Sequence, residues 1–159
     1  MSTHAPQRPE NSSEKPWRIG IVASQYNATF VDAMLEQAQQ EFCTLAPHAT
    51  IEVVRAPGSF EIPLLVKLLA ERRNLDAILA LGVILRGETA HADLIASAIS
   101  QHLLRISLDY SLPVIHEVLL LDNEAQARAR CLKEPYNRGA EAAQAALAAV
   151  QAAHSIQPL

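Results

Sequence analysis

Short apolar segments alternate along the chain with segments in which apolar residues recur every three or four positions. The apolar segments predict strands covered on both faces, at 17–23, 51–54, 77–84 and 113–119. The periodic segments predict helices at 29–46, 64–69, 94–103 and 123–130, and after 139. Because strands and helices alternate, we expect right-handed crossovers, a parallel sheet and helices on both of its faces.

The predicted elements fit one domain. A chain of 159 residues suits a single core, and its polar start predicts a disordered N-terminal tail at 1–15 and one domain at 16–159. The fold class is α/β, a flavodoxin-like three-layer α/β/α sandwich with a four-stranded parallel sheet. In such sheets ligands bind beyond the carboxyl ends of the strands. The chemistry is therefore expected in the loops at 24–27, 57–61, 86–91 and after 119.

Composition narrows the class of protein. The formal net charge of −4 excludes a nucleic-acid binder driven by excess positive charge. Cys43 and Cys131 form no CxxC motif and indicate reduced thiols, and the scattered histidines lack the spacing of a metal site. The polar segment 1–15 lacks the apolar core of a secretory signal, and no segment reaches the roughly 18 apolar residues of a membrane helix. We expect a cytoplasmic protein with no nucleic-acid, membrane or metal partner.

The loop at 86–91 is the richest in chemistry. Gly87 permits a tight turn, and the N–H groups of Glu88 and Thr89 precede a helix, where they can receive a phosphate. Thr89 fits equally an ordinary helix N-cap without a ligand. His91 falls in the first helical turn, where the helix dipole favours a neutral imidazole that accepts protons. It is the leading general acid/base, and the alternative is a structural histidine.

Two aromatic residues and three charged residues extend the predicted site. Tyr26 and Phe60 lie in adjacent loops and can stack on a planar heterocycle, although Phe60 fits the core as well. Glu61 offers a carboxylate to sugar-like hydroxyls, or is simply an acid at a helix start. Arg128 and Arg130 are two residues apart, so only one of them can point into a cleft. That arginine suits phosphate, while the alternative is two solvated side chains.

Two polar residues, His116 and Glu117, interrupt the otherwise apolar fourth strand. Burying polar groups in a central strand costs free energy unless they are paired. These residues therefore predict a subunit interface or a pocket wall, and an edge strand would also tolerate them.

Five segments follow one another along the chain: RIGIVASQYN, PGSFEIP, ALGVILRGETAH, PVIHEVL with EAQARAR, and NRGAEAA. Together they resemble the lumazine synthase family, from residue 18 to about 150. The resemblance implies a transferase that condenses 5-amino-6-(D-ribitylamino)uracil with 3,4-dihydroxy-2-butanone 4-phosphate. The products are 6,7-dimethyl-8-ribityllumazine, phosphate and water, in the penultimate step of riboflavin biosynthesis. No redox step occurs, so the resemblance implies no cofactor.

The same resemblance implies roles on the ring side of the site. Tyr26 would stack on the uracil ring, and Ser59 and Phe60 would contact the pyrimidine and the ribityl chain. Glu61 would bind ribityl hydroxyls. The pocket wall would be formed by Ile84 and Leu85.

On the phosphate side, the resemblance implies that the N–H groups of Glu88 and Thr89 hold the phosphate together with Arg130. This places the choice between the two arginines at Arg130 and leaves Arg128 solvated. His91 would move protons between the reacting groups.

Four positions depart from the family pattern. Tyr26 replaces the usual Phe or Trp and can still stack. His116 stands where an aromatic residue of the neighbouring subunit commonly closes the pocket, and is carried over as an interface contact. Glu134 occupies a position that is often lysine, beside Lys133. Arg138 replaces a substrate-binding lysine and keeps its charge but not its geometry.

The resemblance also implies an assembly. The family forms homopentamers with active sites between neighbouring subunits, and some members build shells of twelve pentamers. We expect a pentamer, and the resemblance does not decide between a single pentamer and a shell. Two other functions fit the same residues: a flavodoxin-like module that binds a flavin or a ribityl-pterin-like ligand without catalysis, and a shell-forming container whose site has decayed.

Overall fold

A strand followed by a helix is the repeating unit of the chain. The computed structural model describes residues 8–9, 15–133 and 137–156. The strands are β1 (Arg18–Ser24), β2 (Thr50–Ala56), β3 (Ala77–Leu85) and β4 (Val114–Leu121). The helices are α1 (Ala28–Leu45), the 3-10 turn η1 (Ser59–Glu61), α2 (Ile62–Glu71), α3 (His91–Tyr110), α4 (Glu124–Cys131) and α5 (Arg138–Ile156).

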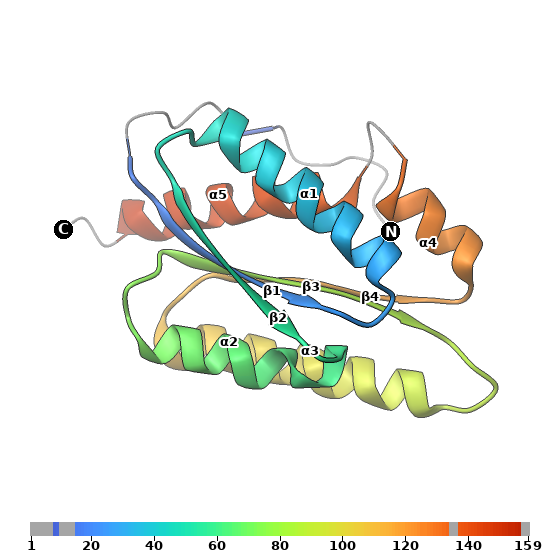
Figure 1. The fold of residues 1–159 in the computed structure, drawn as a ribbon. Helices are drawn as coiled ribbons and strands as arrows, with labels where there is room; N and C mark the ends of the chain where they lie inside the picture. Colours follow the sequence, from blue (N-terminus) through green and yellow to red (C-terminus); the bar gives the residue numbers. More distant parts are fainter. Residues whose placement is uncertain (1–7, 10–14, 134–136, 157–159) are drawn as a thin grey trace.

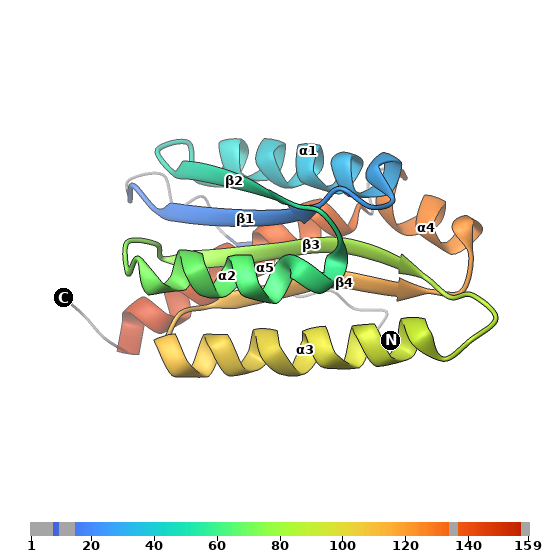
Figure 2. The ribbon, with the colours of Figure 1, turned by 60° about the horizontal axis from the view of Figure 1, so that its bottom comes forward.

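The four strands form one parallel sheet in the order β2-β1-β3-β4. Helices α1, α4 and α5 cover one face of this sheet, and α2 and α3 cover the other (Figures 1 and 2). The predicted α/β sandwich with a four-stranded parallel sheet is thereby confirmed. Because β4 is an edge strand, its outer side has no strand beside it among the residues that the structure describes.

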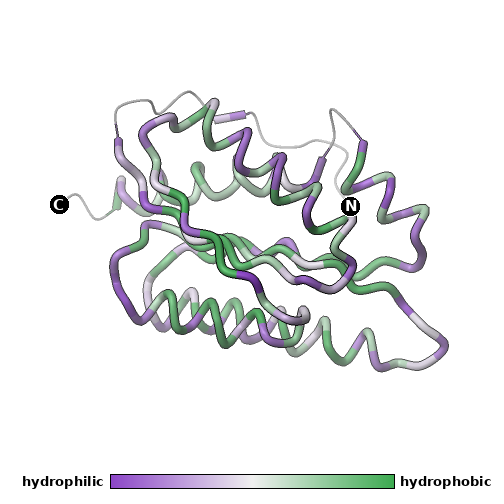
Figure 3. The backbone as a smooth tube through the Cα atoms, in the orientation of Figure 1, coloured by the Kyte–Doolittle hydropathy of each residue, from purple (hydrophilic) through white to green (hydrophobic). Residues whose placement is uncertain are grey.

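Alternating side chains of the strands divide the core into two layers. On β1, Ile19 and Ile21 pack on the side of α1 and α5, whereas Val22 packs on the side of α2 and α3. Successive residues of a strand point to opposite faces, so a strand that is apolar throughout is buried on both sides. Figure 3 shows mainly hydrophobic strands, with hydrophilic positions among them, between helices in which apolar and polar residues alternate.

Helices α1 and α5 approach each other closely at Gly139. Gly139 begins the first turn of α5, and a Cβ atom at this position would overlap the backbone of Met34 on α1. Only glycine lets the two backbones approach so closely.

The expected tail falls outside the described residues, apart from positions 8, 9 and 15. Arg8 forms a two-pronged ion pair with Glu41 on α1, at 2.7 and 2.9 Å. Among the described residues, no helix is both long enough and apolar enough to cross a membrane.

Candidate active site

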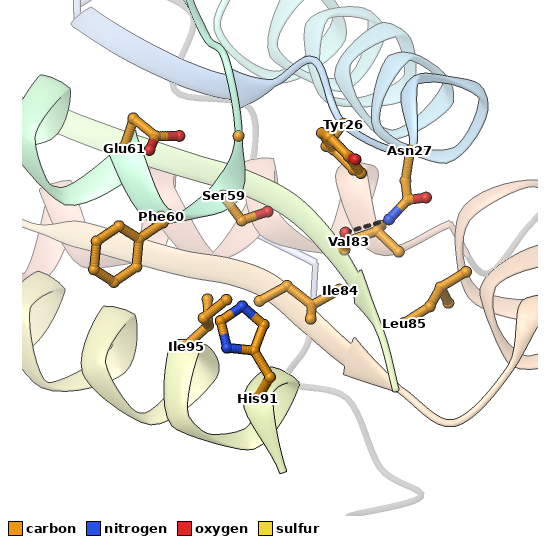
Figure 4. A pocket seen from close by; sticks show the side chains of 11 residues that line it. Tyr26, Asn27, Ser59, Phe60, Glu61, Val83, Ile84, Leu85, His91 and Ile95 are labelled. Carbon is orange, nitrogen blue, oxygen red and sulfur yellow. Dashed lines mark hydrogen bonds between the residues drawn. The ribbon is translucent and has the colours of Figure 1, made fainter. Parts of the chain in front are cut away.

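A cavity of about 450 Å³ opens at the carboxyl ends of β1, β2 and β3 (Figure 4). Its walls come from the turn after β1, the segment 58–61 after β2, the end of β3 at 83–85, and the first turns of α3. The structure brings seven of the predicted site residues to this one cavity. They are Tyr26, Ser59, Phe60, Glu61, Ile84, Leu85 and His91.

The turn that presents Tyr26 is held by the next residue, Asn27. The backbone of Asn27 is left-handed, with φ 54° and ψ 43°, a conformation that Asn tolerates better than most residues. Its side-chain Nδ2 donates to the carbonyl oxygen of Val83 at 2.7 Å, which ties the turn to β3 (Figure 4). Sequence reasoning did not assign Asn27 to the site. An Asn between an aromatic residue and a helix start was the available signal.

Ser59 lies at the floor of the cavity, with only 8% of its surface exposed. Its hydroxyl has no hydrogen-bond partner among the described residues. Gly82 on β3 makes room for it, because a Cβ there would come within 2.9 Å of the Ser59 oxygen. A buried hydroxyl without a partner costs about 1–3 kcal/mol, so this atom is suited to a polar group of a ligand.

His91 is the first residue of α3, and its ring projects toward the side chains of Ile84 and Ile95 (Figure 4). No described residue forms a hydrogen bond with this imidazole, so its ring nitrogens are available to a ligand in the cavity. The backbone N–H of His91 donates to the Thr89 hydroxyl at 3.4 Å. Thr89 is not the N-cap of α3, because Ala90 holds that position and no side chain caps the helix; the Thr89 hydroxyl only contacts the turn before it.

The loop before His91 is braced by Arg86. The guanidinium donates to Asp93 in α3 at 2.7 Å and also to Asp122 after β4. Its presence lowers the pKa of the Asp93 carboxyl, while hydrogen bonds from Gln126 and then from Arg86 lower the pKa of Asp122. Arg86 is therefore occupied by two carboxylates and is a brace rather than a free anion ligand.

Glu88 and Thr89 belong to the exposed loop beside the cavity and do not line it. Their backbone N–H groups have no hydrogen-bond partner in the part of the chain that the structure describes. Two free N–H groups next to a helix start can receive an anion.

Three predicted site residues lie elsewhere in the chain. His116, Arg130 and Arg138 belong to β4, α4 and α5 and do not line the cavity. The ring of His116 forms hydrogen bonds with Ser100 at 2.8 Å and with the N–H of Val118 at 3.3 Å. Burial of the ring lowers its pKa.

Two further charged positions, Arg128 and Arg130, belong to α4. Arg130 is half-buried at the end of α4, whereas Arg128 is exposed and lies 3.5 Å from Glu124. Glu134 lies outside the described residues. Within a single chain, the structure thus separates the predicted ring-binding residues from Arg130 and Arg138.

Fold and cavity together define a class: an α/β sandwich that takes a small ligand at the carboxyl ends of its parallel strands. The cavity combines aromatic walls, a buried hydroxyl and a histidine.

Comparison with known proteins identifies the family. The family model described as 6,7-dimethyl-8-ribityllumazine synthase matches residues 16–154. Three relatives bear that same name. The protein from Mycolicibacterium vanbaalenii is 44% identical over 138 residues, 84% of each chain. The protein from Thermococcus kodakarensis is 40% identical over 132 residues, 82% of each chain, and the one from Polaromonas sp. is 36% identical over 134 residues, 84% of each chain. The chain belongs to the 6,7-dimethyl-8-ribityllumazine synthase family.

Proposed function

We propose that this protein forms 6,7-dimethyl-8-ribityllumazine from 5-amino-6-(D-ribitylamino)uracil and 3,4-dihydroxy-2-butanone 4-phosphate. Family membership supports the reaction. One structural observation supports the assignment of this reaction to particular residues. Tyr26, Ser59 and His91 come from three segments far apart in the sequence and line one cavity.

The uracil substrate fits the ring side of the cavity. Tyr26 offers its exposed ring for stacking, and the unpaired Ser59 hydroxyl offers a hydrogen bond to a polar atom of the pyrimidine. Phe60 borders the pyrimidine and the ribityl chain, and Glu61 accepts hydrogen bonds from ribityl hydroxyls. Ile84 and Leu85 exclude water from the wall of β3.

The butanone phosphate fits beside the loop that begins α3. The free N–H groups of Glu88 and Thr89 hold its phosphate, with Arg130 as the guanidinium partner. The amine of the uracil attacks the ketone to give an imine, phosphate is eliminated, and the second amine closes the ring. Imine formation and ring closure each release water, so protons move at nitrogen and oxygen within reach of His91.

Positioning carries more of this rate enhancement than proton transfer. General acid/base help from one residue contributes about 10²–10⁴-fold, whereas alignment of two reactants contributes up to about 7–11 kcal/mol. His91 therefore assists a reaction that the cavity mainly aligns.

We propose a homopentamer in which one protomer supplies the cavity and its neighbour supplies Arg130, Arg138 and His116. The distance of these residues from the cavity of their own chain supports a shared site. Exposed leucines on the outer side of α2 and α3 support association, since monomers rarely expose large apolar patches. These are Leu64, Leu68, Leu94, Leu104 and Leu108.

The chain is proposed to act as one domain over residues 16–159 and in the cytoplasm. The two cysteines support this location, because Cys43 is a free, exposed thiol and Cys131 is also unpaired. Free thiols are typical of a reducing compartment.

A fluorescence assay tests the reaction. Purified protein is mixed with both substrates, and the lumazine product is followed by its fluorescence. Turnover well above the uncatalysed condensation is expected. A rate equal to that background overturns the proposal and leaves a ligand-binding module or an inert container. Light scattering on the same sample tests the pentamer and separates it from a shell.

A further inference from the structure

Glu117 is a buried carboxylate in an apolar row. On β4 it stands between Ile115 and Leu119, on the side of the sheet that α5 covers, and only 8% of its surface is exposed. Burial raises the pKa of this carboxyl, against the opposing effect of Arg138. A carboxylate costs free energy in such a place unless a partner holds it, so its partner decides what it does.

The partner is Arg138, at the start of α5. Its Nε donates to Glu117 Oε1 at 2.8 Å, and its Nη1 donates to Glu141 Oε2 at 2.5 Å. A guanidinium is planar, so two bonds on different nitrogens fix the direction of the whole group. Its Nη2 group has no partner among the described residues, and 27% of the side chain is exposed. The Nε and Nη1 side of the guanidinium is therefore held by two carboxylates, and its Nη2 side is left for a ligand.

The backbone that carries Arg138 is fixed as well. The side chain of Asn137 accepts the N–H of Gly139 at 2.8 Å and donates to the carbonyl of Cys131. Gly139 in turn lies against the backbone of Met34. Neither the start of α5 nor the guanidinium can shift without breaking these contacts.

The charges around the Arg138 guanidinium decide what this group can bind. Arg138 faces the two carboxylates of Glu117 and Glu141, and the charge of Arg130 also acts on Glu117, so two guanidiniums and two carboxylates leave this local group without an excess of positive charge. A phosphate dianion would be repelled by the carboxylates. A neutral acceptor, such as a carbonyl oxygen of the pyrimidinedione ring, would gain a directed hydrogen bond without that repulsion.

We propose that Glu117 is a positioning residue that orients Arg138 and offsets its charge, so that the free Nη2 edge serves the ring carbonyl of the uracil substrate and not the phosphate. This inference rests on the proposed function. In the shared site, Glu117 and Arg138 of one protomer act on the cavity of its neighbour, while Arg130 remains the phosphate ligand.

The test compares Glu117→Gln with the wild type in the full assembly, with KM measured for each substrate. Gln keeps the shape and one acceptor but removes the charge. We expect KM for the uracil substrate to rise about tenfold or more, with KM for the butanone phosphate unchanged or lower and kcat within about threefold. Glu124→Gln, on an exposed pair of α4, is the matched control and leaves both KM values unchanged.

A double variant separates positioning from a merely structural role. Arg138→Lys keeps the charge but cannot form two bonds from one plane, so it should show the same KM split. The double variant combines Glu117→Gln with Arg138→Lys. If Glu117 acts through Arg138, KM for the uracil substrate is no higher in the double variant than in Arg138→Lys alone, because the same contact cannot be lost twice. If the two losses multiply, the inference is wrong. Should Glu117→Gln fail to fold, Arg138→Lys alone decides: an unchanged KM for the uracil substrate overturns the inference.

The two proposals fail differently. A wild type without turnover removes the proposed function and this inference with it. An active wild type whose Glu117→Gln variant loses kcat alone, or binds only the phosphate substrate less well, overturns the role of Glu117 and leaves the function standing.

Discussion

Two regions of the molecule treat polar side chains in opposite ways. In the cavity, the Ser59 hydroxyl is buried without a partner, and Tyr26 exposes 72% of its surface. Along β4, Glu117 is paired with Arg138 and His116 is bonded to Ser100. Unpaired groups gain free energy when a ligand arrives, whereas paired groups hold structure in place. Changes in the cavity should therefore lower turnover without lowering stability, and changes around β4 should lower stability or act through its arginines.

The largest effect is expected where α5 begins. Gly139→Ala places a methyl group on the backbone of Met34, which has no flexible side chain to move aside. We expect a loss of about 3 kcal/mol or more in the free energy of unfolding, measured by denaturant titration. Gly87→Ala is the control, because nothing lies within 4 Å of a Cβ there, and it should stay close to wild type. Equal losses in both variants would contradict the close contact.

Two variants separate proton transfer from phosphate binding. His91→Ala should lower kcat about 10²-fold and leave measurable activity, because alignment in the cavity remains. Arg130→Ala should chiefly raise KM for the butanone phosphate. Steady-state kinetics with each substrate varied in turn distinguishes them, with His48→Ala, an exposed turn residue, as control. Equal and total loss in both variants would refute the assigned roles.

Tyr26→Ala tests stacking in the cavity. Removal of an aromatic ring from a planar base costs about 1–3 kcal/mol, so KM for the uracil substrate should rise about 5- to 150-fold. The melting temperature should not fall, because the ring is largely exposed. Tyr26→Phe keeps the ring and should stay near wild type. A strong defect in Tyr26→Phe would point to the hydroxyl instead of stacking.

Ser59→Ala and Ser100→Ala sharpen the contrast directly. Ser59 has an unpaired hydroxyl, so its removal should leave stability unchanged or raise it by about 1 kcal/mol while raising KM for the uracil substrate. Ser100 donates to the carbonyl of Ala96 and is bonded to His116, so its removal should cost about 1 kcal/mol. Thermal unfolding of both variants shows whether each substitution raises or lowers the stability relative to the wild type. A destabilised Ser59→Ala would show that the hydroxyl is satisfied in the free protein.

The smallest effect concerns pH and Arg86. The pKa values of Asp93 and Asp122 are lowered in the folded protein, so the stability they contribute is present above their unfolded value of about 4. It is lost as the pH falls through the folded values. Arg86→Gln should therefore lower the melting temperature slightly at pH 7, and by less as the pH falls through the lowered pKa values of the two carboxyls. About 1 M salt should shrink the difference, because these pairs are exposed. A melting-temperature difference between Arg86→Gln and the wild type that grows as the pH falls would contradict the bracing role of Arg86.

Much of the candidate site was predictable because its residues sit at strand ends. Any parallel sheet gathers the segments that follow its strands, so Tyr26, Phe60 and His91 could be placed together before the structure was known. Asn27 was not predicted, since its role depends on a left-handed turn and on the carbonyl of Val83, 56 residues away. The lack of a hydrogen-bond partner for the Ser59 hydroxyl could not be predicted either, because it depends on all the residues that pack around that hydroxyl in the folded protein.

The sequence by itself determined the elements, their alternation and the edge of the sheet where the cavity opens, because periodicity and chain order are local properties. Only the tertiary structure decided that β4 lies at an edge, that Glu117 faces α5, and that Arg130 and Arg138 stand apart from the cavity of their own chain. Strand order and side-chain pairing depend on contacts between distant segments, and such contacts leave no mark on local hydrophobic pattern.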